Sequence, residues 1–116
     1  SAQEDWENHY KAKIDLSSAK LSNAYLEDIN LVGADLSGAD LNDTSLRGAI
    51  LGKADLSGSN LRKANLIGAD FSDADLSDAD LSGADLTNAD LRRATMNGVI
   101  LCNTTMPDGS VIYSGC

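Results

Sequence analysis

The stretch Ala69–Leu91, ADFSDADLSDADLSGADLTNADL, repeats a motif of five residues and decides the fold. Each repeat places a large apolar residue two positions after an alanine, with an aspartate between them. The spacing extends in both directions, because all sixteen leucines of the chain occupy positions ending in 1 or 6. Phe71, Met96 and Met106 fill the remaining positions of that series, so nineteen consecutive pentads span residues 14–108 without an insertion.

A period of five residues fits neither a helix nor a straight strand. Five residues advance about 500° around an α-helix, so the leucines would not form a stripe. In a strand, residues five apart face opposite sides. The chain must therefore turn once per pentad, with alanine and leucine inward, aspartate outward and the next two residues at a corner. Seven of the ten glycines occupy the second corner position, where a positive φ costs glycine little. The pattern predicts an all-β solenoid.

The run Ala34–Phe71, ADLSGADLNDTSLRGAILGKADLSGSNLRKANLIGADF, resembles the pentapeptide repeat family, whose consensus is A-(D/N)-L-X-X. The resemblance extends over all nineteen pentads. It implies a right-handed quadrilateral β-helix with four pentads per coil and nearly five coils. The sequence by itself does not distinguish four faces from three.

The N-terminal end of such a solenoid needs a cover for its apolar axis and its unpaired backbone groups. Residues 1–13 lack glycine and proline and place Trp6 and Tyr10 four residues apart. We expect a short capping helix whose aromatic face packs on the first coil of the repeat domain, residues 14–108. A second interpretation makes the two aromatic residues a partner site.

At the other end, Pro107 breaks the period and opens a turn, and Val111–Tyr113 then favours a short strand or apolar flap over the last coil. Residues 109–116 are therefore predicted to form a C-terminal cap. Cys102 and Cys116 are the only cysteines. A disulfide between them would close a loop of about 15 residues and stabilise the cap by about 3 kcal/mol. Two free thiols are the alternative.

The formal charge of −9 over 116 residues disfavours direct binding to nucleic acid or to membrane surfaces. No apolar run approaches the roughly 20 residues that cross a bilayer, so we expect no membrane insertion. The only histidine, His9, has no nucleophile motif around it. Phosphate loops and zinc-protease motifs are absent from the sequence. We therefore expect a non-enzymatic protein with no cofactor, and a monomer rather than a dimer.

The outward aspartates allow three interpretations. The structural one is that each carboxylate accepts hydrogen bonds from its own corner, because Asn30, Asn60 and Asn65 occupy equivalent positions. The second is a cation site on a column of residues twenty apart, but calcium usually requires six to eight oxygens from a folded loop. The third is mimicry of a nucleic acid backbone. The column considered for the cation comprises Asp15, Asp35, Asp55 and Asp75.

The candidate interaction surface is the acidic run without lysine or arginine, which comprises Asp70, Asp75, Asp80, Asp85 and Asp90. Bulky outward apolar side chains are a second set of candidates, and scattered surface apolar residues are their simpler explanation. These are Tyr25, Ile50, Ile67 and Ile100.

The resemblance also implies a function. With its predicted disulfide, the chain is similar to exported pentapeptide repeat proteins of the cyanobacterial or chloroplast thylakoid lumen and of the bacterial periplasm. We therefore expect a structural or protein-interaction module with an unknown protein partner. The alternative is a cytoplasmic DNA mimic directed at a type II topoisomerase such as gyrase, since some members of the family act in that way.

Overall fold

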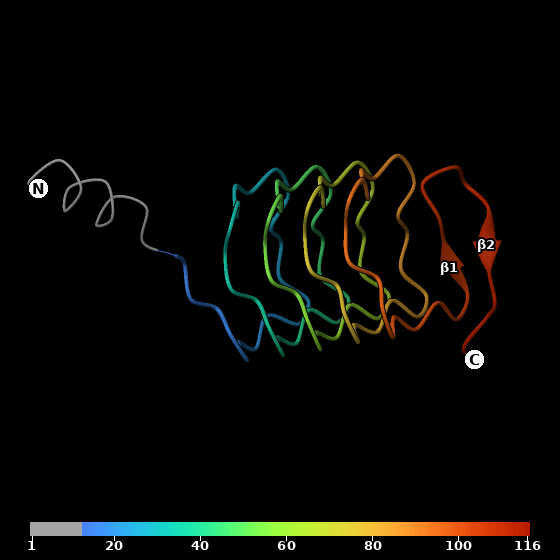
Figure 1. The fold of residues 1–116 in the computed structure, drawn as a ribbon, viewed down its shortest axis with the longest axis horizontal. Coiled ribbons are helices and arrows are strands. Elements are labelled where there is room, and N and C mark those ends of the chain that lie inside the picture. Colours follow the sequence, from blue (N-terminus) through green and yellow to red (C-terminus); the bar gives the residue numbers. More distant parts are fainter. Residues whose placement is uncertain (1–12) are drawn as a thin grey trace, which may run out of the picture.

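The computed structural model describes residues 13–116 and arranges them as stacked coils (Figure 1). Fifteen parallel bridges each join two residues twenty apart, from the Asp15–Asp35 pair to the Asp85–Thr105 pair. Each pentad contributes one bridging residue, so a coil contains four pentads and has four faces. The backbone therefore confirms the four pentads per coil that the resemblance implied.

The turn from Leu36 to Ala39 shows how each corner is built. The amide of Ala39 donates to the carbonyl of Leu36 at 3.0 Å, which closes a four-residue turn. Gly38, at the third position of this turn, has φ of +64°, as a type II turn requires. The amide of Gly38 donates at 2.9 Å to the backbone carbonyl of Ser57 in the next coil. Within residues 13–116, eleven residues other than glycine adopt a positive φ. They are Ser18, Asn23, Asp28, Asp43, Lys53, Lys63, Asp73, Asp78, Asn88, Arg93 and Asn103.

The core is the axis of the solenoid. From Leu36 to Leu86 the central apolar residue of every pentad has no exposed surface, and Phe71 is the largest of these side chains. The flanking backbone forms the hydrogen-bond ladder between coils. The amide of Leu36 donates to the backbone carbonyl of Asp55 at 2.7 Å, and the amide of Asp55 donates to the carbonyl of Ala34 at 2.9 Å. Alternation of inward and outward side chains within each pentad thus buries leucine and alanine together.

The terminal coils are less well covered than the middle ones. Most central residues near the two ends are only partly buried, among them Leu16, Leu21, Leu91, Met96 and Leu101. The predicted N-terminal helix with Trp6 and Tyr10 lies outside the described residues.

A short hairpin forms the C-terminal end (Figure 1). Strand β1 (Thr104–Thr105) pairs antiparallel with β2 (Val111–Ile112). The predicted strand is confirmed, but it covers the last coil only in part. Val111 remains 43% exposed and Tyr113 67% exposed, because β2 continues the edge of one face and does not cross the axis.

Ser59 occupies an inward position that alanine fills in most pentads, and its hydroxyl is buried without a hydrogen-bond partner among residues 13–116. Ser59→Ala is expected to raise the free energy of unfolding by about 1 kcal/mol, since it removes an unsatisfied buried group. Denaturant titration of both proteins measures the change. Thr44→Val is the matched control, because the Thr44 hydroxyl does donate, to Leu21 at 2.8 Å, and its loss should destabilise the protein. A less stable Ser59→Ala protein would contradict this account.

Candidate interaction surface

The outward residues of the pentads form four columns, one on each face of the solenoid, because residues twenty apart are bridged. Each column is named here after its first residue. The Asp15 column contains Asp15, Asp35, Asp55, Asp75 and Thr95. The Lys20 column contains Lys20, Asp40, Asn60, Asp80 and Ile100. The Tyr25 column contains Tyr25, Ser45, Asn65, Asp85 and Thr105. The Asn30 column contains Asn30, Ile50, Asp70 and Asp90.

The Asp15 column has a carboxylate in four successive coils, and each carboxylate is bonded to the serine two residues later. Asp35 Oδ1 accepts from the Ser37 amide at 3.0 Å and from the Ser37 hydroxyl at 2.6 Å. The same two hydrogen bonds, from the amide and the hydroxyl of the serine two residues later, are made to Asp15, Asp55 and Asp75. The structural interpretation of these aspartates is confirmed, and it uses only one oxygen of each carboxylate for the corner. All the side-chain hydrogen bonds that these four residues accept from residues 13–116 go to Oδ1.

Asparagine makes the same corner without the charge. Asn60 Oδ1 accepts from the Arg62 amide at 3.0 Å, as Asp35 Oδ1 does from Ser37. The corner thus needs an acceptor oxygen two residues before the amide and does not need a carboxylate. The charge of the Asp15 column is therefore separable from its structural role.

The candidate surface Asp70, Asp75, Asp80, Asp85 and Asp90 does not form one patch. Only Asp70 and Asp90 share a column, and the other three lie one on each of the remaining columns. Residues five apart occupy successive faces, because each pentad ends in a corner. Closeness in the sequence therefore distributes these carboxylates around the solenoid, and the five residues do not lie on one face.

Arginine side chains neutralise several of the carboxylates at the C-terminal half of the solenoid. Arg92 contacts Asp90 at 2.7 Å and Arg93 contacts Asp73 at 2.8 Å. Hydrogen bonds from Arg92 lower the pKa of Asp90 to about 2. Those from Arg93 lower the pKa of Asp73 below its ordinary value. These ion pairs leave the Asp15 column as the most regular row of carboxylates.

The shifted carboxylates predict a loss of stability in acid. The Ser37 hydroxyl and amide lower the pKa of Asp35, and those of Ser77 lower the pKa of Asp75. The unfolded chain then binds protons at a higher pH than the folded chain, so stability is highest above the ordinary aspartate pKa of 3.8. We expect it to fall as the pH drops from about 4 to about 2, the pKa of Asp90. Denaturant midpoints measured across that range test this expectation.

A single substitution isolates the cause of this shift. Ser37→Ala should move the pKa of Asp35 back toward 3.8, since the hydroxyl bond is its largest cause. Carboxyl NMR titration measures it, and Asp75 in the same protein is the internal control because Ser77 is unchanged. An unmoved Asp35 would show that the serine hydroxyl does not set its pKa.

The exposed apolar side chains do not form a continuous stripe. Tyr25 is 75% exposed, Ile50 39% and Ile100 38%, and each belongs to a different column. Ile50 is bridged to Asp70 in the next coil, and Ile67 lies at a corner. These residues are best explained as separate surface positions.

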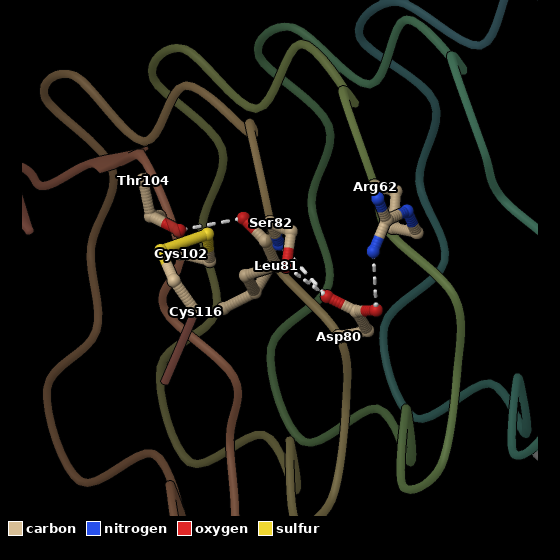
Figure 2. The surroundings of a disulfide bond; sticks show 7 residues. All are labelled: Arg62, Asp80, Leu81, Ser82, Cys102, Thr104 and Cys116. Carbon is tan, nitrogen blue, oxygen red and sulfur yellow. Dashed lines mark hydrogen bonds and ion pairs between the residues drawn. A yellow bond between two sulfur atoms is a disulfide. The ribbon is translucent and has the colours of Figure 1, made fainter. Parts of the chain in front are cut away.

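The two cysteines form a disulfide at the C-terminal end (Figure 2). Cys102 lies at a corner of the last coil, and its Cα is 4.7 Å from that of Cys116. The neighbouring Thr104 is held by a bond from its hydroxyl to the carbonyl of Leu81 at 2.7 Å. The disulfide therefore fixes the end of the cap to a hydrogen-bonded part of the ladder.

Within residues 13–116, no three histidine, cysteine, aspartate or glutamate side chains come together as a group that could hold a metal ion. The same part of the chain contains no helix with the length and hydropathy of a membrane span. His9, the residue considered for catalysis, lies outside the described residues.

Comparison with known proteins gives a clear match to a family model. The model for pentapeptide repeats matches in eight copies over residues 14–52, 39–78 and 69–106. No curated protein matches. The matched repeats span most of the chain and include every column described above.

Three solved structures illustrate the likeness. A pentapeptide repeat protein of the Arabidopsis thaliana thylakoid lumen is 27% identical over 87% of this chain and 74% of its own, with a TM-score of 0.51. The plasmid-mediated fluoroquinolone resistance protein QnrB1 is 16% identical over 81% of this chain and 65% of its own, with a TM-score of 0.53. HetL of the cyanobacterium Nostoc, involved in heterocyst differentiation regulation, is 33% identical over 84% of this chain, with a TM-score of 0.39. This chain spans 53% of the length of HetL.

The repeats and the two structures with the higher TM-scores imply that the coils form a right-handed β-helix. The match indicates a repeat architecture and no catalytic family. The likeness to QnrB1, at 16% identity, concerns the fold alone.

Proposed function

This chain belongs to the pentapeptide repeat family, and on that premise we propose that it is a non-enzymatic protein-interaction module exported to a thylakoid lumen or a bacterial periplasm. Two observations support the proposal. The disulfide between Cys102 and Cys116 suits an oxidising compartment. The likeness to the thylakoid lumen protein of Arabidopsis extends over 87% of the chain.

The surface that we propose for the partner is the Asp15 column. It has a carboxylate in each of four successive coils, and each carboxylate has one oxygen that its own corner does not use. Adjacent coils of parallel backbone are about 4.8 Å apart, so the column presents a straight row of negative charge. A partner segment with regularly spaced lysine or arginine side chains fits this row. Asp75 is the member of the original candidate surface that belongs to it.

Asparagine substitution tests this surface without disturbing the fold. The double variant Asp35→Asn and Asp55→Asn keeps the acceptor oxygen of each corner, as Asn60 does, and removes two charges. The matched control is Asp40→Asn and Asp85→Asn, which removes two charges from two other columns. Full-length oxidised proteins would be used to capture partners from extracts of the source compartment. We expect capture to weaken by about tenfold in the first variant only, which is the effect of losing two exposed charge pairs. Equal capture by both variants would exclude this column.

The compartment is tested by the intact mass of the protein from its source cells, alkylated at the moment of lysis. We expect a mass without alkyl adducts, which means that Cys102 and Cys116 are bridged in the cell. Two adducts would mean free thiols and would contradict export to an oxidising compartment.

The alternative of a topoisomerase-directed DNA mimic makes a separate prediction. A DNA supercoiling assay with gyrase would show inhibition or protection if that function were correct. We expect no effect, because Lys20 and Ile50 interrupt two of the acidic columns, and Arg62 and Arg92 neutralise Asp80 and Asp90 in those same two columns. A clear effect at micromolar protein would replace the proposal above with this alternative.

A further inference from the structure

An open groove lies beside the disulfide, at the corner between the Lys20 and Tyr25 columns. Its volume is about 210 Å³. Three stacked corners from successive coils line it, and the amide of Gly83 donates to the carbonyl of Cys102 at 2.9 Å. The lining residues are Arg62, Lys63, Ser82, Gly83, Cys102 and Asn103. The groove therefore places two cationic residues and one cysteine of the disulfide around the same space.

The two cations differ in their availability. Arg62 Nη1 contacts Asp80 Oδ2 at 3.1 Å (Figure 2), so its charge is largely satisfied. Lys63 forms no ion pair with any residue in the range 13–116. Its stem lies against Gly83, where an added Cβ would come within 3.3 Å of the Lys63 Cγ. Gly83 lies on the coil between Lys63 and Cys102. Because it has no side chain, it leaves room for the Lys63 side chain.

We propose that the Cys102–Cys116 disulfide is a site of reversible thiol–disulfide exchange with a carboxylate-bearing thiol, which the groove binds through Lys63. The groove presents Cys102 to the incoming thiol, so Cys102 Sγ is the atom attacked. A positive charge beside the site raises the local concentration of anionic thiols on a chain that otherwise repels them. The inference goes beyond the proposed interaction function and does not depend on it.

The exchange has two balanced steps. The incoming thiolate attacks Cys102 Sγ, a mixed disulfide forms there, and the bond to Cys116 breaks with its electron pair left on Cys116 Sγ, which takes a proton from water. A second thiolate then attacks the sulfur of the bound thiol, which gives the oxidised dimer of the thiol and the Cys102 thiolate. Two molecules of thiol are oxidised and one protein disulfide is reduced. The oxidised dimer drives the reverse reaction.

Exchange changes the C-terminal end of the solenoid. Gly115 packs against the last coil, since a Cβ there would lie 3.6 Å from the Ile100 Cγ2 and from the Leu101 amide nitrogen. Once Cys116 is released, the disulfide no longer holds this segment against Leu101, which is already only partly buried. Exchange thus releases the last residues of the cap from the corner at Ile100 and Leu101.

Two small thiols of opposite charge test the recognition. Oxidised full-length protein would react with glutathione, which carries carboxylates, and with cysteamine, which carries an ammonium group. Initial rates are corrected for the thiolate fraction of each thiol. Lys63→Gln should reduce the glutathione rate relative to the cysteamine rate by about two- to fivefold, the effect of one exposed charge pair. Lys53→Gln is the matched control, because Lys53 has the same corner position and a φ of +60° at a different corner.

Peptide mapping of the mixed disulfide gives a second readout. Samples acidified at partial conversion should carry glutathione on Cys102. A glutathione adduct on Cys116 would show that attack comes from solvent and that the groove plays no part. An equal change of the rate ratio in Lys63→Gln and Lys53→Gln would show only the effect of net charge. Either result overturns the proposal.

Discussion

Phe71→Ala is expected to lower the free energy of unfolding by about 3–5 kcal/mol. Phe71 has no exposed surface and is the largest fully buried side chain of the axis. The twenty-residue repeat places it one coil from Leu51 and one coil from Leu91. Bonds at fixed spacing, such as Phe71 amide to Asp90 carbonyl at 2.8 Å, hold the coils apart. The cavity therefore cannot collapse, and we expect the upper part of the range. Urea denaturation followed by circular dichroism measures the change.

Two control variants separate cavity formation from other effects. Phe71→Leu restores the residue found at most central positions and should cost less than about 1.5 kcal/mol. Ile50→Ala removes an outward side chain that is 39% exposed and should cost about 1 kcal/mol or less. If Phe71→Ala cost no more than Ile50→Ala, the axis would not be a tightly packed core.

The period of the sequence was sufficient to predict inward and outward positions, but not where outward residues meet. Leu36 and Asp35 were assigned to opposite sides from the alternation within one pentad, and the burial of Leu36 confirms this. The contact between Asp70 and Asp90 depends on the number of pentads per coil, which the five-residue period does not contain. The resemblance implies that number, but the acidic run from Asp70 to Asp90 is contiguous only in the linear sequence. Applying the twenty-residue spacing to it would have separated the five carboxylates.

Side chains at the corners were the least predictable. Glycine at the second corner position indicated a positive φ, but Lys53, Lys63 and Arg93 adopt the same conformation. Hydrogen bonds of the ladder fix the corner backbone regardless of the residue. The positive φ costs an L-residue about 1–2 kcal/mol. The groove at Lys63 is not predictable from a single pentad, although Lys63, Gly83 and Asn103 are spaced by twenty. The groove is indicated by a glycine, Gly83, that stacks between Lys63 and the corner at Cys102. This arrangement is visible only when the coils are stacked.

Reduction of the Cys102–Cys116 disulfide is expected to lower the free energy of unfolding by about 3 kcal/mol, the value for a closed loop of this length. The two residues are 14 positions apart. The loop includes β1 and β2 (Val111–Ile112), so the bond restricts the unfolded chain at the end where the axis is least covered. Urea denaturation with and without a phosphine reductant measures the difference. The double variant Cys102→Ser and Cys116→Ser should match the reduced protein and should not respond to reductant.

The form of the reduced transition decides how the cap is coupled to the coils. Each coil contacts only its neighbours in a solenoid, so stability is nearly a sum of local terms. If Thr105, which bonds both to Ala84 in the coil below and to β2, couples the hairpin to the ladder, a single transition will shift to lower urea. If the cap unfolds by itself, the reduced protein will show an early second transition, and amide exchange will increase only after Leu101. An unchanged midpoint and unchanged exchange would mean that the disulfide adds no stability.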